Sequence, residues 1–306
     1  MANRDALLSL AGSTLAEYLI DPAVIEILIN PNGTCFVERF GLGMKEQRAP
    51  RRSDLDRFLS AIAHETQQEW RDAHPSLHAA LADIGWRIQA CRPPQAPELT
   101  LALRKHPAQA FTLEQYLDQA SVTETMCRVL RDAVQEHKRI IVSGATGSAK
   151  TSLLGALLQE LSTTEERICL LEDDPELLCS ARNTVFFRTR EGVSMTQLVK
   201  DALRYRPDRL IIGEVRDGAA LAMARALETG HSGISTVHAE SAEGTLSRLE
   251  GLILEVSASP QRELLGSVID LIVHMERAGR QFRCTKILAV RGYDTGRMAY
   301  NLHEVA

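Results

Sequence analysis

The segment GATGSAKTSLL, residues 144–154, limits what this chain can fold into more than any other part of the sequence. It follows the apolar run RIIVSG, which is typical of a buried strand, and it leads into the helix-forming segment KTSLLGALLQELS. A loop of small residues between a strand and a helix lets successive backbone N–H groups face one anion at the start of the helix. We therefore expect a phosphate-binding loop, rather than only a Gly/Ser turn that caps a helix.

The residues of this loop have separate expected roles. Lys150 brings a positive charge to the β- and γ-phosphates of ATP, and the Thr151 hydroxyl is a ligand for Mg²⁺. Ala149 departs from the pattern GxxxxGK[ST], because it occupies the place of the second glycine. In a left-handed backbone, alanine would cost roughly 1 to 2 kcal/mol there, which puts turnover in question more than binding. The expected nucleotide-binding residues of the loop are Gly144, Ala145, Thr146, Gly147, Ser148, Ala149, Lys150, Thr151 and Ser152.

Acidic residues follow two later strands. LLEDDPELL places Glu172, Asp173, Asp174 and Glu176 at the end of the next strand, and RLIIGEV places Glu214 at the end of another. At the carboxyl edge of a parallel sheet, such groups can activate a water molecule or support a metal ion beside bound phosphates. A solvated acidic turn is the simpler interpretation of the first cluster taken alone.

Two histidines lie in the segment TGHSGISTVHAESAEGTLSRLE, at His231 and His238. Their spacing does not by itself indicate a metal pair, and isolated histidines are more often structural or surface groups.

The remaining sequence predicts two domains, since 306 residues exceed the usual size of one. Residues 1–105 contain two helical segments, a strand pair joined by the turn at 30–33, and a short strand at 99–103. We expect them to form a small N-terminal α/β domain, followed by a linker over residues 106–120. Residues 121–306 alternate strands and helices, which predicts a mostly parallel sheet covered on both faces.

Composition and charge exclude several classes of protein. Apolar residues make up 44% of the chain and charged residues 25%, which argues against disorder. A net charge of −5 gives no general attraction to nucleic acid, so we expect no stable nucleic-acid binding. We find no signal peptide and no apolar run near the ~18 residues of a transmembrane segment. We expect a cytoplasmic protein, peripheral to a membrane, whose six dispersed cysteines are reduced.

Four motifs taken together are far more specific than any one of them. GATGSAKT, LLEDDPE, RYRPDRLIIGEVRD and TGHSGISTVHAESAEGTLSRL resemble, in order and spacing, the Walker A loop, acidic box, Walker B element and histidine box of type II and type IV secretion ATPases. Upstream, VIEILINPNGTCFVERFG, RIQACRPP and LALRKHPAQAFTLEQYL are similar to the N-terminal domain and linker of conjugative-transfer ATPases of the TrbB type. The resemblance covers nearly the whole chain.

This resemblance implies a fold and a set of residue roles. It implies a homo-hexameric ring whose subunits each have an N-terminal α/β domain and a RecA-like P-loop domain, with ATP and Mg²⁺ between them. It assigns water activation to Glu172, support of Mg²⁺ through water to Glu214, and γ-phosphate sensing to His231 and His238. It also matches several arginines that would reach nucleotide or a neighbouring subunit, although a surface ion pair is an equal alternative for each: Arg104, Arg204, Arg206 and Arg216.

The expected function is ATP hydrolysis coupled to movement between domains, with Lys150, Glu172 and Glu214 as the catalytic residues. Its output would be substrate transfer or pilus assembly by a secretion machine, whose inner-membrane components would be the partners at the inner face of that membrane. Two alternatives stay open: a nucleotide-binding scaffold with weak turnover because of Ala149, and a RecA-like DNA translocase. The acidic charge balance counts against the translocase.

Overall fold

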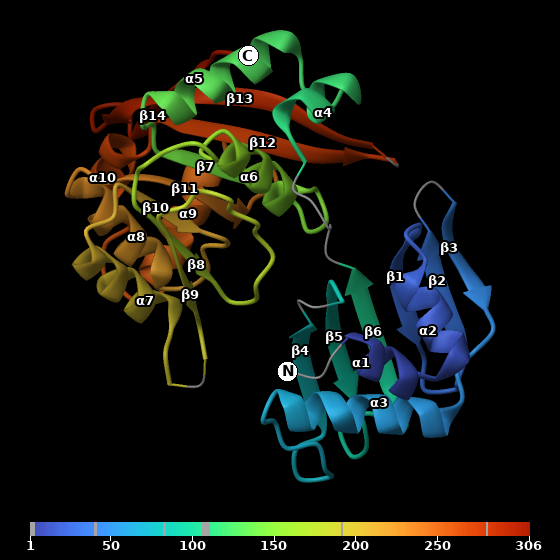
Figure 1. The fold of residues 1–306 in the computed structure, drawn as a ribbon. Helices are drawn as coiled ribbons and strands as arrows, with labels where there is room; N and C mark the ends of the chain where they lie inside the picture. The colour runs from blue at the N-terminus through green and yellow to red at the C-terminus, as the bar shows by residue number, and fades with distance from the viewer. Residues whose placement is uncertain (1–3, 40–41, 82–83, 106–110, 191, 280) are drawn as a thin grey trace. The chain divides into compact units, whose positions relative to one another are not determined.

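The computed structural model describes residues 4–39, 42–81, 84–105, 111–190, 192–279 and 281–306. The chain divides into two compact units, Met1–Ala108 and Gln109–Ala306 (Figure 1). Each unit has its own sheet and its own hydrophobic core, because an apolar sheet face must be covered by a second layer.

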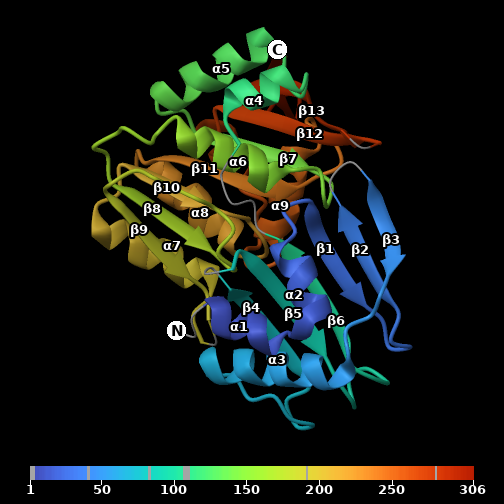
Figure 2. The ribbon, with the colours of Figure 1, turned by 45° about the vertical axis from the view of Figure 1, so that its right-hand side comes forward.

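The first unit, in its described part, is a six-stranded antiparallel sheet with helices on one face (Figure 2). Apolar residues of these helices, such as Leu15 and Phe58, pack on the sheet residues Ile27, Ile88 and Leu103. The helices are α1 (Arg4–Leu10), α2 (Gly12–Ile20) and α3 (Arg52–Glu65). The strands, in spatial order, are β3 (Gly43–Gln47), β2 (Cys35–Arg39), β1 (Val24–Ile29), β6 (Thr100–Lys105), β5 (Trp86–Cys91) and β4 (Ser76–Leu81).

The second unit is built on a sheet that has eight strands in the described residues. Six neighbouring strands are parallel, and β13 and β14 extend one side as an antiparallel pair. In spatial order the strands are β14 (Ala299–Glu304), β13 (Gln281–Asp294), β12 (Leu271–Ala278), β7 (Ile140–Gly144), β11 (Ser232–His238), β10 (Arg209–Ile212), β8 (Ile168–Glu172) and β9 (Thr184–Arg188).

Helices cover both faces of this sheet (Figure 1, Figure 2). Successive residues of a strand point to opposite faces, so Ile140 and Val142 of β7 belong to one core cluster and Ile141 belongs to the other. The first cluster includes α4 (Leu113–Asp118), α5 (Glu124–Gln135) and α6 (Lys150–Gln159). The second includes α7 (Met195–Ala202), α8 (Ala219–Glu228), α9 (Thr245–Leu254) and α10 (Arg262–Val268). A short 3₁₀ helix, Leu203–Tyr205, follows α7.

Helix α4 lies inside the segment 106–120 that we expected to be a linker. Thr112 begins this helix with a capping box, because its hydroxyl accepts from the Gln115 N–H and the Gln115 side chain accepts from the Thr112 N–H. Leu113 and Tyr116 are buried in the core of the second unit. This part of the expected linker is therefore packed structure, and residues 106–110 lie outside the described residues.

Two expectations from composition can be compared with the fold. All six cysteines are free, as expected. Among the described residues, no helix combines the length and the apolar character that crossing a bilayer requires.

Candidate nucleotide-binding site

The residues of the predicted chemistry gather at one edge of the second sheet. The register of the parallel strands pairs Gly144, the last residue of β7, with His238, the last residue of β11. Glu172 ends β8, and Glu214 follows the end of β10. Because parallel strands end at a common edge, all four residues lie at the carboxyl edge, where open α/β sheets bind their ligands.

The loop from residue 144 to residue 149 makes a tight turn. A side chain at Gly144 would place its Cβ 2.2 Å from the carbonyl oxygen of Met275, so only glycine fits there. Gly147 and Ala149 both have left-handed backbones, with φ of 70° and 68°. Glycine adopts this conformation freely, whereas alanine does so with strain. The strain that we expected for alanine in a left-handed backbone therefore applies to Ala149. Helix α6 begins at the next residue.

Lys150 is held inside the site, with only 6% of its surface exposed. Its Nζ donates to the carbonyl oxygen of Ala145 at 2.8 Å and lies 3.0 Å from Nδ1 of His238. Burial lowers the pKa of Lys150, and the nearby Glu214 carboxylate opposes that change. The positive charge of the loop is thus bound to the protein's own acceptors.

His238 connects this lysine to Glu214. Its Nε2 lies 3.0 Å from Oε1 of Glu214, while Oε2 of Glu214 accepts from Nη2 of Arg216 at 2.7 Å. Since an ammonium group can only donate, Nδ1 of His238 must accept, and we assign the ring proton to Nε2. Burial and the charge of Lys150 lower the pKa of His238, which favours this neutral form. Burial opposes ionisation of Glu214, but the contacts with Arg216 and His238 outweigh it and lower its pKa.

Glu172 is fixed in a buried position, with 4% of its surface exposed. Its Oε1 accepts from the backbone N–H groups of Glu176 and Leu177 at 2.9 Å and 2.8 Å. Burial raises the pKa of Glu172, although these two hydrogen bonds act in the opposite direction. A carboxylate with fixed orientation and raised pKa is suited to accept a proton from water.

A cavity of about 550 Å³ lies between the loop and the end of β11, and this volume is within the usual range for small-molecule sites. The sequence assigns no role to the lining residues that follow His238 in the chain, because the path of the chain after β11 depends on packing. The lining residues are Ala145, Thr146, His238, Ala239, Glu240, Ser241, Gly244 and Arg248.

Three predicted site residues lie at the other edge of the sheet. His231 precedes β11, and its Nδ1 lies 2.9 Å from the Thr229 hydroxyl. A strand rises about 3.3 Å per residue, so about 23 Å separate His231 from His238. Arg204 and Arg206 precede β10 at the same amino edge. The expected pairing of the two histidines at one phosphate is therefore not found within the unit.

Arg104 belongs to β6 of the first unit, whereas the loop and its acids belong to the second. Of the four predicted arginines, Arg216 lies at the carboxyl edge of the second sheet, where it forms an ion pair with Glu214.

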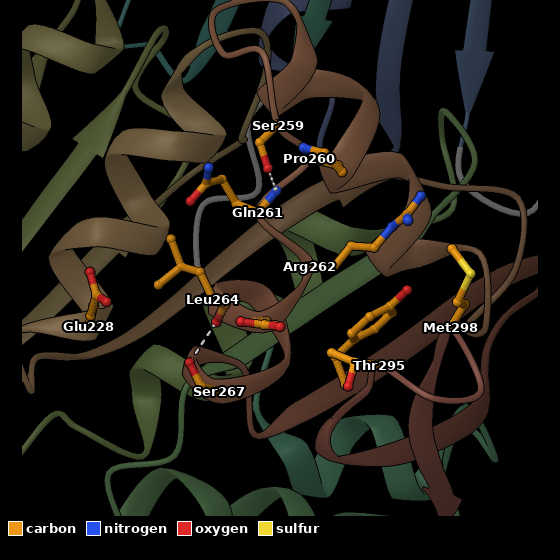
Figure 3. A pocket seen from close by; sticks show the side chains of 11 residues that line it. Glu228, Ser259, Pro260, Gln261, Arg262, Leu264, Ser267, Thr295 and Met298 are labelled. Atoms are coloured by element: carbon orange, nitrogen blue, oxygen red, sulfur yellow. Dashed lines mark hydrogen bonds between the residues drawn. The ribbon is translucent and has the colours of Figure 1, made fainter.

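A larger cavity, of about 870 Å³, lies at the amino edge (Figure 3). It is formed by the end of α8, by α10 and the loop before it, and by the end of β13 and the turn that follows. It contains no residue of the loop or of the acidic motifs, and its Arg262 is already bound to Glu250 at 2.8 Å. It is therefore not the candidate site, and its lining residues are Glu228, Ser259, Pro260, Gln261, Arg262, Glu263, Leu264, Ser267, Tyr293, Thr295 and Met298.

Comparison with known proteins decides the family. A family model described as "Type II/IV secretion system protein" matches residues 44–288. The chain belongs to this family. The predicted family is therefore confirmed, and with it the predicted class of enzyme, an ATPase.

Relatives and solved structures agree with this assignment. The chain is 36% identical to "Probable conjugal transfer protein TrbB" of Sinorhizobium fredii, over 94% of this chain and 89% of that protein. It is 31% identical to "Type IV secretion system protein VirB11" of Brucella suis, over 85% of this chain and 83% of that protein. The crystal structure of the Brucella suis VirB11 ATPase matches with a TM-score of 0.50 and 29% identity, over 93% and 94% of the two chains. The Legionella pneumophila ATPase DotB shares the fold, with a TM-score of 0.66 and 20% identity over 93% and 80%.

Proposed function

We propose that this protein is the ATP-hydrolysing motor of a type IV secretion or conjugative transfer system. The observation that carries the proposal is the contact of Lys150, His238 and Glu214 beside the loop, with Glu172 at the same carboxyl edge of the sheet. Membership of the secretion family and the similarity to conjugal transfer proteins support the kind of machine. The energy of each ATP hydrolysed would drive either transfer of a substrate or assembly of a pilus.

ATP would bind with its phosphates on the loop and with Lys150 turned from the Ala145 carbonyl to the β- and γ-phosphates. Glu172 would accept a proton from the water that attacks the γ-phosphate in line, since its carboxylate is already oriented by two backbone N–H groups. His238 would sense whether the γ-phosphate is present, because it contacts both Lys150 and Glu214. Closure of the two units around the nucleotide would couple this chemistry to movement.

The residues present fit a Mg²⁺ ion that accompanies the nucleotide. The Thr151 hydroxyl and the Glu214 carboxylate offer the oxygen ligands that Mg²⁺ prefers, the second of them through water. The described residues hold no group of three or more His, Cys, Asp or Glu side chains that would bind a metal without nucleotide. Phosphates and water would thus supply most of the coordination, and the ion would neutralise charge on the phosphates.

The second unit would be a RecA-like domain, and six copies of the chain would form a ring. Repetition of one heterologous contact brings one edge of a subunit to a different edge of the next. Arg204 and Arg206 are exposed at the amino edge, away from their own loop, so they are suited to reach a neighbour. The ring would be cytoplasmic and would dock on inner-membrane components of the machine. Arg104 of the first unit is proposed to reach nucleotide as the units close.

The left-handed backbone of Ala149 favours a second candidate, a nucleotide-binding scaffold with weak turnover. Release of phosphate from ATP by the purified full chain, with and without Mg²⁺, separates the two. We expect Mg²⁺-dependent hydrolysis that Lys150→Ala abolishes while the far-UV spectrum stays unchanged. Turnover equal to wild type in that variant would remove the site assignment, and binding without turnover in wild type would favour the scaffold. Strong stimulation by DNA would favour a translocase.

A further inference from the structure

We propose that Arg248 binds the terminal phosphate of the nucleotide, that is, the γ-phosphate of ATP and then the inorganic phosphate released from it. The inference rests on the proposed function and adds a phosphate ligand to which the sequence analysis gave no role, although Arg248 lies in the segment that resembles the histidine box. Three observations carry it: the position of Arg248 in the cavity, the free state of its guanidinium, and the identity of its neighbours.

The first observation is position. Arg248 is in the first turn and a half of α9, and side chains of a helix tilt toward its N-terminus. The guanidinium is thereby directed back toward Gly244 and Ser241, which line the same 550 Å³ cavity as Ala145 and Thr146 of the loop. An arginine from a helix that follows β11 therefore shares a cavity with the first residues of the phosphate-binding loop.

The second observation is the lack of a partner. Another arginine at this edge, Arg216, is bound to Glu214 at 2.7 Å. Within the described residues, the Arg248 side chain makes no hydrogen bond and no ion pair, although Glu240 lines the same cavity. An exposed guanidinium that is not neutralised by the protein keeps its five donors available for an anion.

The third observation identifies the phosphate. His238 lines the cavity together with Arg248, and it is the residue that contacts Lys150 and Glu214. The cavity therefore lies at the end of the site where the terminal phosphate is expected. Arginine binds phosphate oxygens through paired N–H donors, so the contact would be made with ATP and lost with ADP. Arg248 would also be the first residue that inorganic phosphate meets as it leaves through the cavity.

The test compares the binding of two nucleotides to the full wild-type chain and to two Arg248 variants. Calorimetry would give the dissociation constants of ADP and of a non-hydrolysable ATP analogue for wild type, Arg248→Gln and Arg248→Lys. We expect Arg248→Gln to weaken binding of the analogue about tenfold, as for loss of a charge-assisted hydrogen bond, and to change ADP binding less than twofold. Arg248→Lys, which keeps the charge, should recover part of the affinity. Arg128→Gln is the matched control, because Arg128 is an exposed arginine on α5, which packs on the other face of the sheet.

Several outcomes would overturn the inference. Unchanged affinity for the analogue would remove Arg248 from the phosphate site. An equal loss for both nucleotides, or a loss also seen in Arg128→Gln, would indicate a structural effect. A change in sedimentation without nucleotide would make Arg248 a contact between subunits instead. Failure of the proposed function is distinguishable, because it would appear as hydrolysis that survives in Lys150→Ala, whatever the Arg248 variants bind.

Discussion

At the scale of single residues, the left-handed backbone at position 149 has a measurable consequence. Ala149→Gly removes a methyl group from a conformation with φ of 68° and ψ of 27°. The relief of strain is partly offset by the greater freedom of glycine in the unfolded chain, which leaves a gain of about 1 kcal/mol. We expect this gain of about 1 kcal/mol to appear in at least one of three quantities. These are the affinity for nucleotide measured by calorimetry, the rate of turnover measured by phosphate release, and the free energy of unfolding measured by urea denaturation.

The neighbouring Gly147 supplies the control. Its φ is 70°, and a Cβ there would have no atom within 4 Å, so Gly147→Ala adds strain without a clash. It should lower the same quantities by a similar amount. No change in Ala149→Gly combined with a loss in Gly147→Ala would mean that the loop has already adapted to the methyl group at 149.

Glu172→Gln tests the assignment of the base. Glutamine keeps an oxygen that can accept from the N–H groups of Glu176 and Leu177, so the loop after β8 should keep its fold. Only proton acceptance is lost, and hydrolysis should fall by about a hundredfold or more while nucleotide binding stays near normal. Measurement of kcat and of the nucleotide dissociation constant on the same variant tests this assignment. An equal loss of rate and of affinity would point to Glu214 or Asp173 as the base.

The pH dependence of turnover follows from the same carboxylate. Burial raises the pKa of Glu172 above its ordinary value, and the group must be ionised to accept a proton. The rate should therefore fall as the pH is lowered through that raised pKa, at a higher pH than an exposed glutamate would require. A kcat profile on the acid side checks this, and Glu172→Gln should lose that part of the profile. An acid limb that persists in the variant would assign it to another group.

At the scale of elements, the strand pair β7–β12 holds a polar contact beneath the loop. Oγ of Ser143 lies 3.0 Å from Nδ1 of His274, and both side chains are buried, with His274 only 2% exposed. His274→Leu would leave the Ser143 hydroxyl buried without its partner and should lower the free energy of unfolding by about 1 to 3 kcal/mol.

Urea denaturation of His274→Leu, of Ser143→Ala and of the double variant measures this contact as a double-mutant cycle. The double variant should lose less than the sum of the single losses, because both partners are then apolar. Strict additivity would show that the two side chains do not interact. Burial also lowers the pKa of His274, so its contribution is complete above the unfolded pKa of about 6.5 and is lost as the pH falls below it.

Elements with a strong apolar pattern could be predicted from the sequence, and others could not. Strands β7, β8 and β10 are continuous buried runs, and each was expected. Strand β3 was not, because it is an exposed edge strand of sequence GMKEQ without an alternating pattern. Helix α4 was missed because its capping box lies within a stretch interpreted as a connector.

The candidate site was predictable where sequence order determines position. The strand-to-helix junction identified Lys150, and the ends of two strands identified Glu172 and Glu214. Spacing alone could not distinguish the two ends of β11, so His231 was grouped with His238 although the strand separates them. Arg248 was not singled out because the direction of α9 is decided by packing against α8 and β11 rather than by its sequence.

At the scale of the whole molecule, the ring is the main prediction. A non-hydrolysable ATP analogue should favour the assembled form, because its phosphates would be shared by groups from two rigid bodies. Sedimentation at micromolar concentration, with and without the analogue, measures this. A strictly monomeric protein that is fully active per chain would remove the ring motor from consideration.

Arg104→Ala tests the contribution of the first unit to hydrolysis. This arginine is exposed on β6, so its loss should lower turnover more than it lowers the free energy of unfolding. Lys45→Ala, at an exposed basic residue of β3 in the same unit, is the control for a general change of charge. Equal effects of the two substitutions on turnover would argue against a specific role for Arg104.

The hydrogen bond from Lys150 to the carbonyl oxygen of Ala145 bears on how a turnover ends. A nucleotide that binds as proposed would have to displace an acceptor that the chain itself provides, and this exchange would reduce its affinity. When the product departs, the same carbonyl would be available to receive the ammonium group, so the lysine would not be left buried without a partner. The loop would thus carry an internal competitor for its ligand, which would weaken retention of the product and favour rapid exchange over tight storage.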